Sequence, residues 1–221
     1  SLNVISSDLT GRLMVAATYT VIGYFLPFHI ERFRRQFPRL DIQFFELNRE
    51  PIEEGLLSNR YDMSVLLTSN ILNPALVTEK VLSSTRRLWL PAQHPLLQAE
   101  TVGLREIADE PYIMLTVDEA AHSALKYWSA TPYQPRVILR TSSVEAVRSL
   151  VANGQGVAIL SDMVHRPWSL EGDIIEARPL VDLSEPLDVG LAWRRGTARP
   201  ALVDPFLTVA REQPNAKRLS I

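Results

Sequence analysis

Hydroxyl side chains follow several short apolar runs of the sequence, at positions where they could bind an anion or another polar ligand. The residues assigned to this candidate site are Thr18, Tyr19, Thr20, Thr68, Ser69, Thr116, Thr141 and Ser142. Such hydroxyls, together with the unpaired backbone N–H groups at helix starts, can hold a carboxylate without a buried Lys or Arg. The alternative for each residue taken alone is that it only caps a helix.

The apolar runs before these hydroxyls have the length and composition of buried strands. In the first half of the chain, strands are predicted at 12–17, 41–47 and 61–67, with helices over 26–37 and after Pro51. In the second half, strands are predicted at 112–115, 136–140 and 157–160, with helices over 122–129 and 143–153. The repeated order predicts two parallel, helix-covered sheets. Because ligands of such sheets bind outside the carboxyl ends of the strands, the hydroxyls are expected at those edges.

Two further strands connect the halves. One lies within 85–95 and the other near 187–193, which predicts that the chain crosses near Arg87 and returns near Val189. The helical stretch at 201–211 is then expected to pack back on the first half. The fold class expected is therefore α/β, a two-lobed clamshell in which two βαβαβ lobes are joined by two hinge strands, with a cleft between them.

The composition is that of a globular protein. The chain has 221 residues, 46% of them hydrophobic and 22% charged, and 23 Lys and Arg against 25 Asp and Glu give a net charge of -2. This balance offers no basic surface for wrapping a nucleic acid or lying on an anionic membrane. The longest apolar stretch, 21–28, is far short of the roughly 20 residues of a spanning helix, and 1–11 has no signal-peptide pattern. A cytoplasmic location is expected.

The sequence gives little support for a metal site, a dinucleotide-binding loop or a catalytic site. The absence of cysteine excludes thiolate metal sites, and the four histidines are scattered without ligand spacing, so they are expected on the surface or in turns. Gly154 and Gly156 follow a predicted helix and precede a strand, which is typical of a helix C-cap rather than of a dinucleotide-binding loop. Asp118 and Glu119 are adjacent carboxylates near a predicted helix start, where the helix dipole alone favours acids. We expect no enzymatic activity, no metal and no cofactor.

Several segments together match a known family. They are the Leu-Pro at 26–27 with Phe33 and Phe37-Pro38, the Tyr-Asp-Met-Ser-Val at 61–65, the His-Pro-Leu at 94–96, the Leu-Val-Ala-Asn-Gly-Gln-Gly-Val-Ala-Ile-Leu at 150–160, and the Leu-Ala-Trp-Arg at 191–194. In their order and spacing, the chain resembles the C-terminal effector-binding (regulatory) domain of bacterial LysR-type transcriptional regulators. The resemblance runs from about Gly11 to Glu212.

The resemblance implies a fold similar to type 2 periplasmic binding proteins. It implies a regulatory lobe I at 9–86 plus 190–213 and a lobe II at 87–189, with an effector bound between them by Thr18, Thr20, Thr68, Thr116 and Thr141. It also implies a winged helix-turn-helix that is absent from this chain and through which the protein would bind DNA. The expected partners are a small-molecule effector and a second copy of the domain, with a tetramer in the full-length protein and no membrane.

Two other classes of protein remain as alternatives. A solute-binding protein of a transporter would share the clamshell and differ by a signal segment. A clamshell transferase or dehydratase would need a nucleophile or an acid–base pair in the cleft, and the sequence offers no convincing candidate.

Overall fold

The computed structural model describes residues 9–183 and 185–211 and divides the chain into two compact units. Unit 1 consists of Ser1–Ser83 and Asp188–Ile221, and unit 2 is the continuous segment Ser84–Leu187. Residues 212 and 213, which the expected lobe I includes, lie outside the described residues. Within the described ranges, no helix is long and apolar enough to cross a membrane.

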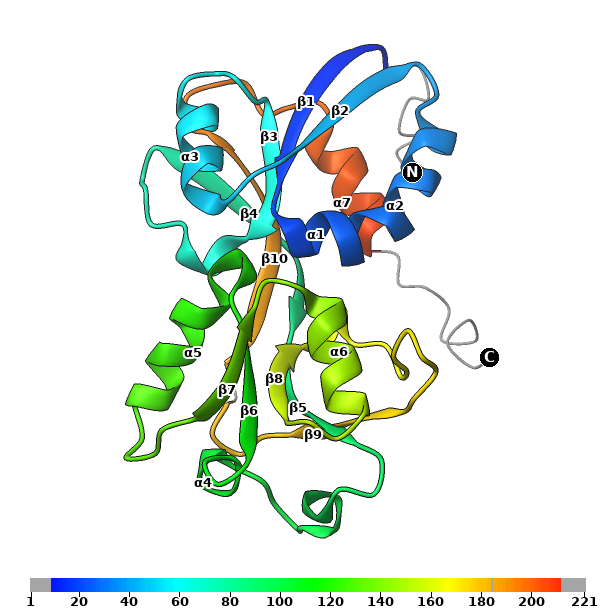
Figure 1. Cartoon of the computed structure of the whole chain (residues 1–221). Helices are drawn as coiled ribbons and strands as arrows, with labels where there is room; N and C mark the ends of the chain where they lie inside the picture. Colours follow the sequence, from blue (N-terminus) through cyan, green and yellow to red (C-terminus); the bar gives the residue numbers. More distant parts are fainter. Residues whose placement is uncertain (1–8, 184, 212–221) are drawn as a thin grey trace. The chain divides into compact units, whose positions relative to one another are not determined.

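Unit 1 contains one five-stranded sheet in the order β2-β1-β3-β10-β4 (Figure 1). Its strands are β1 (Gly11–Ala17), β2 (Leu40–Glu46), β3 (Met63–Leu67), β4 (Leu76–Ser84) and β10 (Leu187–Arg194). β1 pairs in parallel with β2 and β3, as predicted, but β10 is antiparallel to β3. The predicted parallel order of the first three strands is therefore confirmed, and the sheet as a whole is mixed because the returning strand β10 is antiparallel. β4 was not predicted, because Glu79 and Lys80 interrupt its apolar alternation.

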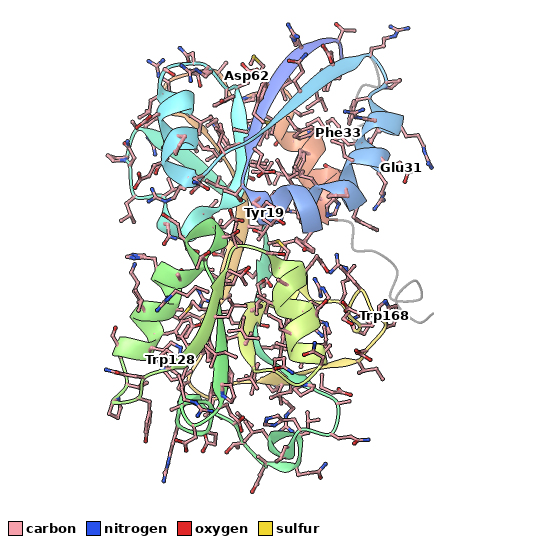
Figure 2. All side chains as sticks on the ribbon, in the orientation of Figure 1. Tyr19, Glu31, Phe33, Asp62, Trp128 and Trp168 are labelled. Carbon is pink, nitrogen blue, oxygen red and sulfur yellow. The ribbon has the colours of Figure 1, made fainter. Side chains whose placement is uncertain are left out.

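Helices cover both faces of this sheet (Figure 1). They are α1 (Tyr19–Tyr24), α2 (Leu26–Gln36), α3 (Arg49–Leu57), the 3-10 turn η1 (Thr68–Asn70) and α7 (Val203–Arg211). The ring of Phe33 on α2 lies 6.1 Å from that of Phe206 on α7, centroid to centroid (Figure 2). Ile52 and Leu56 of α3 pack in a second cluster with Ala16 of β1. The amphipathic helix predicted over 26–37 is thus confirmed.

His29 does not lie on the surface, where the sequence analysis placed the histidines. It is only 6% exposed on α2, and the rings of Phe25 and Phe28 lie 4.5 Å and 5.0 Å from its imidazole. Burial, and to a lesser extent the charge of Arg32, lower the pKa of His29 from 6.5 to about 4, against a backbone hydrogen bond with Val209 that raises it. The imidazole is therefore neutral at pH 7, and a neutral ring is compatible with this apolar position.

Unit 2 has two small sheets. Its strands are β5 (Arg86–Pro91), β6 (Pro111–Leu115), β7 (Arg136–Thr141), β8 (Ala158–Ser161) and β9 (Ile175–Pro179). β6 and β7 are parallel, as predicted, whereas β8, β5 and β9 form an antiparallel sheet. A parallel bridge between Tyr112 and Val157 joins the two sheets. The predicted parallel order is confirmed for β6 with β7 and for the bridge between Tyr112 and Val157, whereas the antiparallel pairing of β8 with β5 was not predicted.

The helices of unit 2 flank these strands (Figure 1). They are α4 (Leu104–Ile107), α5 (Ala120–Ser129) and α6 (Val144–Ala152), with 3-10 turns η2 (Pro95–Gln98), η3 (Val117–Glu119) and η4 (Asp162–Val164). Leu88 and Leu90 of β5 pack in one core cluster with Trp128 of α5 (Figure 2). Gly154, directly after the C-cap of α6, has a φ of +82°, which confirms the predicted turn.

Candidate functional site

The candidate hydroxyls of unit 1 lie at the carboxyl ends of two neighbouring parallel strands. β1 ends at Ala17, which is paired with Val65 of β3, so Thr18 and Thr68 follow adjacent strands at the same edge of the sheet. Thr18 is the N-cap of α1 and Thr68 is the first residue of η1. The register thus puts both predicted residues at the same edge of unit 1, with Thr68 two residues beyond the position opposite Thr18.

Thr18 has an unsatisfied side chain. It is 5% exposed, and its Oγ1 is buried with no hydrogen-bond partner in the part of the chain that the structure describes. Its carbonyl accepts the N–H of Ile22 at 3.0 Å, but its hydroxyl makes no cap bond to α1. A buried hydroxyl without a partner costs free energy, so simple helix capping does not explain this threonine.

The two residues after Thr18 differ in exposure. Thr20 is buried in α1, whereas Tyr19 is 36% exposed at the start of that helix (Figure 2). Tyr19 thus presents an aromatic ring to solvent beside the buried hydroxyl of Thr18.

Thr68 is held by the strand that returns from unit 2. Its Oγ1 donates to the carbonyl oxygen of Asp188 at 3.4 Å. Gly190 makes this approach possible, because a Cβ at that position would lie 2.7 Å from Cγ2 of Thr68 and 2.6 Å from the carbonyl oxygen of Glu79. Ser69 is exposed on η1. Thr68 therefore already has one protein partner.

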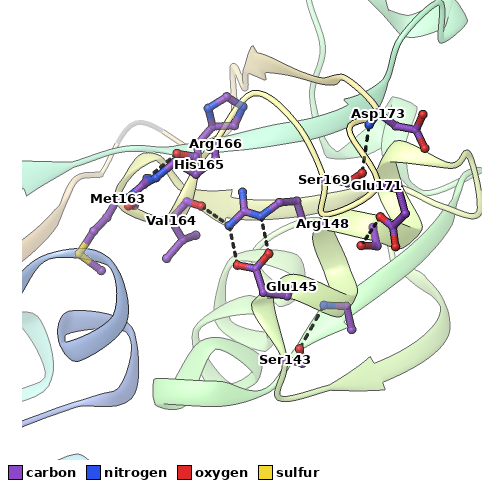
Figure 3. Close-up of polar contacts among 12 residues, drawn as sticks. Ser143, Glu145, Arg148, Met163, Val164, His165, Arg166, Ser169, Glu171 and Asp173 are labelled. Atoms are coloured by element: carbon purple, nitrogen blue, oxygen red, sulfur yellow. Dashed lines mark hydrogen bonds and ion pairs between the residues drawn. The ribbon is translucent and has the colours of Figure 1, made fainter. Parts of the chain in front are cut away.

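The candidate hydroxyls of unit 2 gather at the carboxyl ends of β6 and β7. The backbone N–H of Thr116 donates to the carbonyl of Thr141 at 2.9 Å, and Thr141 Oγ1 accepts the N–H of Ser143 at 3.2 Å. Ser143 is the N-cap of α6 and accepts the N–H of Ala146 at 3.1 Å (Figure 3). Ser142 is exposed. Ser143, which directly follows the candidate residues Thr141 and Ser142, is thus a helix cap.

The first turn of α6 is fixed by a buried arginine that the sequence analysis missed. Arg148 is 2% exposed and donates to both carboxylate oxygens of Glu145, at 3.1 Å and 3.3 Å, and to the carbonyl of Val164 at 2.8 Å (Figure 3). Its guanidinium also lies over the ring of Trp89 at 5.2 Å. The Glu145-x-x-Arg148 spacing was the only sequence signal for this pair.

The loop between β6 and α5 carries backbone strain. Asp118 and Glu119, which the sequence analysis attributed to the helix dipole, have φ angles of +51° and +64°. Such angles are uncommon outside glycine and cost about 1 to 3 kcal/mol each. This strain begins two residues after Thr116, beside the candidate edge.

In the described ranges, no group of three or more His, Cys, Asp or Glu residues could hold a metal ion.

Comparison with known proteins identifies the family. Residues 6–215 match the LysR substrate binding domain, and the chain belongs to that family. This is a family of transcriptional regulators and not of enzymes or transporter proteins, which removes both alternatives considered from the sequence.

The relatives are named as regulators. The chain is 24% identical over 191 residues to the HTH-type transcriptional regulator CysB of Haemophilus influenzae, covering 85% of this chain and 57% of that protein. It is 30% identical over 146 residues to the transcriptional activator CmpR of a Synechocystis strain, covering 66% of this chain and 48% of that protein. The chain spans about half the length of the curated relatives that it matches.

Solved structures share the fold. The regulator HinK of Pseudomonas aeruginosa matches with a TM-score of 0.82 at 23% identity, over 93% of this chain and 71% of HinK. The cofactor-binding domain of the Cbl regulator matches with a TM-score of 0.78 at 22% identity, over 95% and 92% of the two chains. The fold is thus that of LysR substrate-binding domains, which are similar to periplasmic binding proteins, as the sequence predicted.

Proposed function

We propose that this chain senses a small polar or anionic metabolite for a LysR-type transcriptional regulator. The proposal is supported by membership of the family over residues 6–215. The observation that carries the ligand assignment is the buried Oγ1 of Thr18, which has no partner in the described part of the chain and lies at the strand edge where such ligands bind. A ligand acceptor would satisfy this hydroxyl.

We propose that the eight candidate residues with hydroxyl side chains form the ligand-binding site. Thr18 and Thr68 lie at one edge of unit 1, and Thr116 and Thr141 lie at one edge of unit 2. We propose that a carboxylate or a similar group accepts hydrogen bonds from these edges, with Tyr19, Thr20, Ser69 and Ser142 beside them. Binding between lobe I and lobe II remains a prediction. The hydroxyls and unpaired backbone donors are the groups such a ligand needs.

We further propose that the whole protein carries an N-terminal DNA-binding domain. Relatives of this chain are named HTH-type regulators and are about twice its length. The net charge of -2 gives this chain no basic surface for DNA, so DNA contact would belong to that other domain. We also propose that this domain forms a homodimer, that the full-length protein is a tetramer and that it is located in the cytoplasm.

Regulation requires that the ligand bind two arrangements of the protein with different affinity. A ligand shifts an equilibrium only by the difference between its binding free energies to the two states, commonly about 1 to 3 kcal/mol. The Thr116–Thr141 hydrogen bond and the strained residues Asp118 and Glu119 lie at the edge where a ligand would act.

A thermal-shift screen tests the ligand proposal. The purified chain would be heated with individual carboxylates, amino acids and aromatic acids, since a ligand that binds only the folded state raises the melting temperature. A saturable rise for one chemical class, reduced in the Thr18→Val variant, supports the proposal. A rise that is the same in Thr18→Val would place the ligand elsewhere, and no rise with any compound would count against an anion sensor.

A further inference from the structure

Arg86 is a half-buried cation that forms no ion pair with an acidic residue in the part of the chain that the structure describes. It is the first residue of β5, and its guanidinium lies over the ring of Tyr127, 5.4 Å from the centroid. Across the residues that the structure describes, the Arg86 side chain makes no hydrogen bond and no ion pair. Burial lowers the pKa of Arg86, while the charge of Glu185 raises it without forming an ion pair. Arg86 remains protonated, as arginine does in proteins.

Three other arginines of unit 2 have their charge matched or their donors occupied. Arg87, the next residue, pairs with Asp162 at 3.0 Å. Arg148 holds Glu145 and the carbonyl of Val164. Arg178 donates to two backbone carbonyls at 2.6 Å and 2.7 Å. Arg86 differs from these three arginines because, among the described residues, its guanidinium contacts the ring of Tyr127 and is near the charge of Glu185 but forms neither an ion pair nor a hydrogen bond.

The phenol groups near Arg86 do not supply the missing negative charge. The hydroxyls of Tyr112 and Tyr127 lie 3.5 Å apart. Burial raises the pKa of both tyrosines, so both are neutral at pH 7. A half-buried guanidinium among neutral aromatic groups attracts an anion from solution, because its charge is only partly solvated.

The strand register places Arg86 at the edge of unit 2 that carries the candidate hydroxyls. Arg86 pairs with Ser161 of β8, four residues after Val157, which is bridged to Tyr112 of β6. Thr116 is four residues after Tyr112. Continued from that single bridge, the register puts Arg86, Ser161 and Thr116 in one row at the same edge of unit 2. At about 4.8 Å between strands, the backbones of Arg86 and Thr116 are about 10 Å apart.

That separation suits a small anion. An extended arginine side chain covers about half of such a distance, and a carboxylate could then reach the hydroxyl of Thr116 or the N–H groups of the following loop. The planar guanidinium can hold a carboxylate through two parallel hydrogen bonds. We propose that Arg86 binds the anionic group of the ligand at this edge of unit 2, a carboxylate or another small oxyanion. The inference rests on the proposed function and assigns it a charged residue.

Titration with acetate tests this assignment. Nuclear magnetic resonance would follow the Nε–H signal of Arg86 and the backbone amides of Thr116 and Thr141, at constant ionic strength. The chain with Arg86→Met would be compared with Arg87→Met, a control at the neighbouring residue. We expect Arg86→Met to weaken acetate binding at least tenfold and Arg87→Met to leave it unchanged. Methionine keeps the aliphatic contact with Tyr127, and Arg86→Lys provides a second variant that retains the charge.

The outcomes separate the inference from the proposed function. Equal acetate affinity in Arg86→Met and the parent chain overturns the assignment of Arg86, even if Thr116→Val weakens binding. Loss of binding in Arg86→Met alone, with Thr116→Val unaffected, supports Arg86 and counts against the hydroxyl edge. Loss in both variants supports both. An equal loss in Arg87→Met would show a general charge effect and would also overturn the assignment.

Discussion

The backbone N–H of Thr116 donates to the carbonyl oxygen of Thr141 at 2.9 Å and closes the last pair of the β6–β7 ladder, Leu115 with Thr141. The hydrogen bond fixes the backbone of two candidate residues at the same edge of unit 2. A ligand that binds at this edge would therefore meet backbone that is already ordered. Preformed donors raise affinity because little ordering is left to the binding step.

Replacement of Thr141 tests the edge of unit 2. Thr141→Val removes the Oγ1 that accepts the N–H of Ser143, so we expect a loss of about 1 kcal/mol in the free energy of unfolding. Affinity for a ligand found in the thermal-shift screen should fall by about 1 to 3 kcal/mol as well. Urea unfolding and calorimetric titration measure the two effects separately. Thr141→Ser keeps the hydroxyl and should retain both, and unchanged affinity in Thr141→Val would remove this residue from the site.

Replacement of Thr18 should have a different signature. Because its buried Oγ1 has no partner in the described residues, Thr18→Val removes an unsatisfied polar atom and should leave the melting temperature unchanged or raise it. The same variant should bind the ligand more weakly by about 1 to 3 kcal/mol. A lowered melting temperature would show that the hydroxyl already has a structural partner and would contradict the reading of Thr18 as a ligand donor.

Gly190 should not tolerate a side chain. A Cβ there would meet the carbonyl oxygen of Glu79 at 2.6 Å, and backbone of a neighbouring strand cannot move aside cheaply. We expect Gly190→Ala to lower the free energy of unfolding by about 2 to 3 kcal/mol in urea titrations. Gly23→Ala is the matched control, since Gly23 is exposed in α1 with no atom within 4 Å of the added Cβ. That variant should gain up to about 1 kcal/mol.

His29 should make stability depend on pH. Its pKa is about 4 in the folded chain and about 6.5 in the unfolded chain, so the unfolded chain binds more protons between these values. The contribution of His29 is fully present above pH 6.5 and is lost as the pH falls toward 4. Between pH 7.5 and 5 the loss should be about 2 kcal/mol.

Unfolding in urea at several pH values measures this contribution. The variant His29→Leu should flatten the profile between pH 7.5 and 5 relative to the parent chain. His122→Gln, at an exposed position of α5, should leave the profile unchanged. A parent profile that is already flat in this range would show that His29 can be protonated without cost.

The helices and strands whose apolar residues recur with a clear local period could be predicted from the sequence. The spacing of Leu26, Phe33 and Phe37 gave helix α2 to within one residue, because its apolar stripe must face the sheet. β4 and β9 were missed, since charged residues on their exposed positions hide the apolar period. The antiparallel pairing of β10 was missed because strand direction depends on how the chain returns to the sheet, which local pattern does not encode.

The candidate site, like the fold, could be predicted from the sequence only in part. Hydroxyls after strands could be found by reading along the chain. The structure places Thr18 and Thr68 at one edge of unit 1, and Thr116 and Thr141 at one edge of unit 2. Whether a hydroxyl already has a partner could not be read in this way, as Ser143 and Thr18 illustrate. Arg86 was not noticed in the sequence, because the lack of an ion pair at its guanidinium depends on how the strands of unit 2 pack, which the order of residues does not show.

The position of β10 in the sheet bears on the order in which the chain can fold during synthesis. β10 lies between β3 and β4, yet it is made only after all of unit 2. Until residue 194 leaves the ribosome, β4 has no neighbour in its sheet, whereas unit 2 is continuous and can already close its core. Unit 2 can therefore close its core before unit 1 receives its last strand, and until then the edge of β3 that pairs with β10 stays unpaired, as an edge strand prone to aggregation.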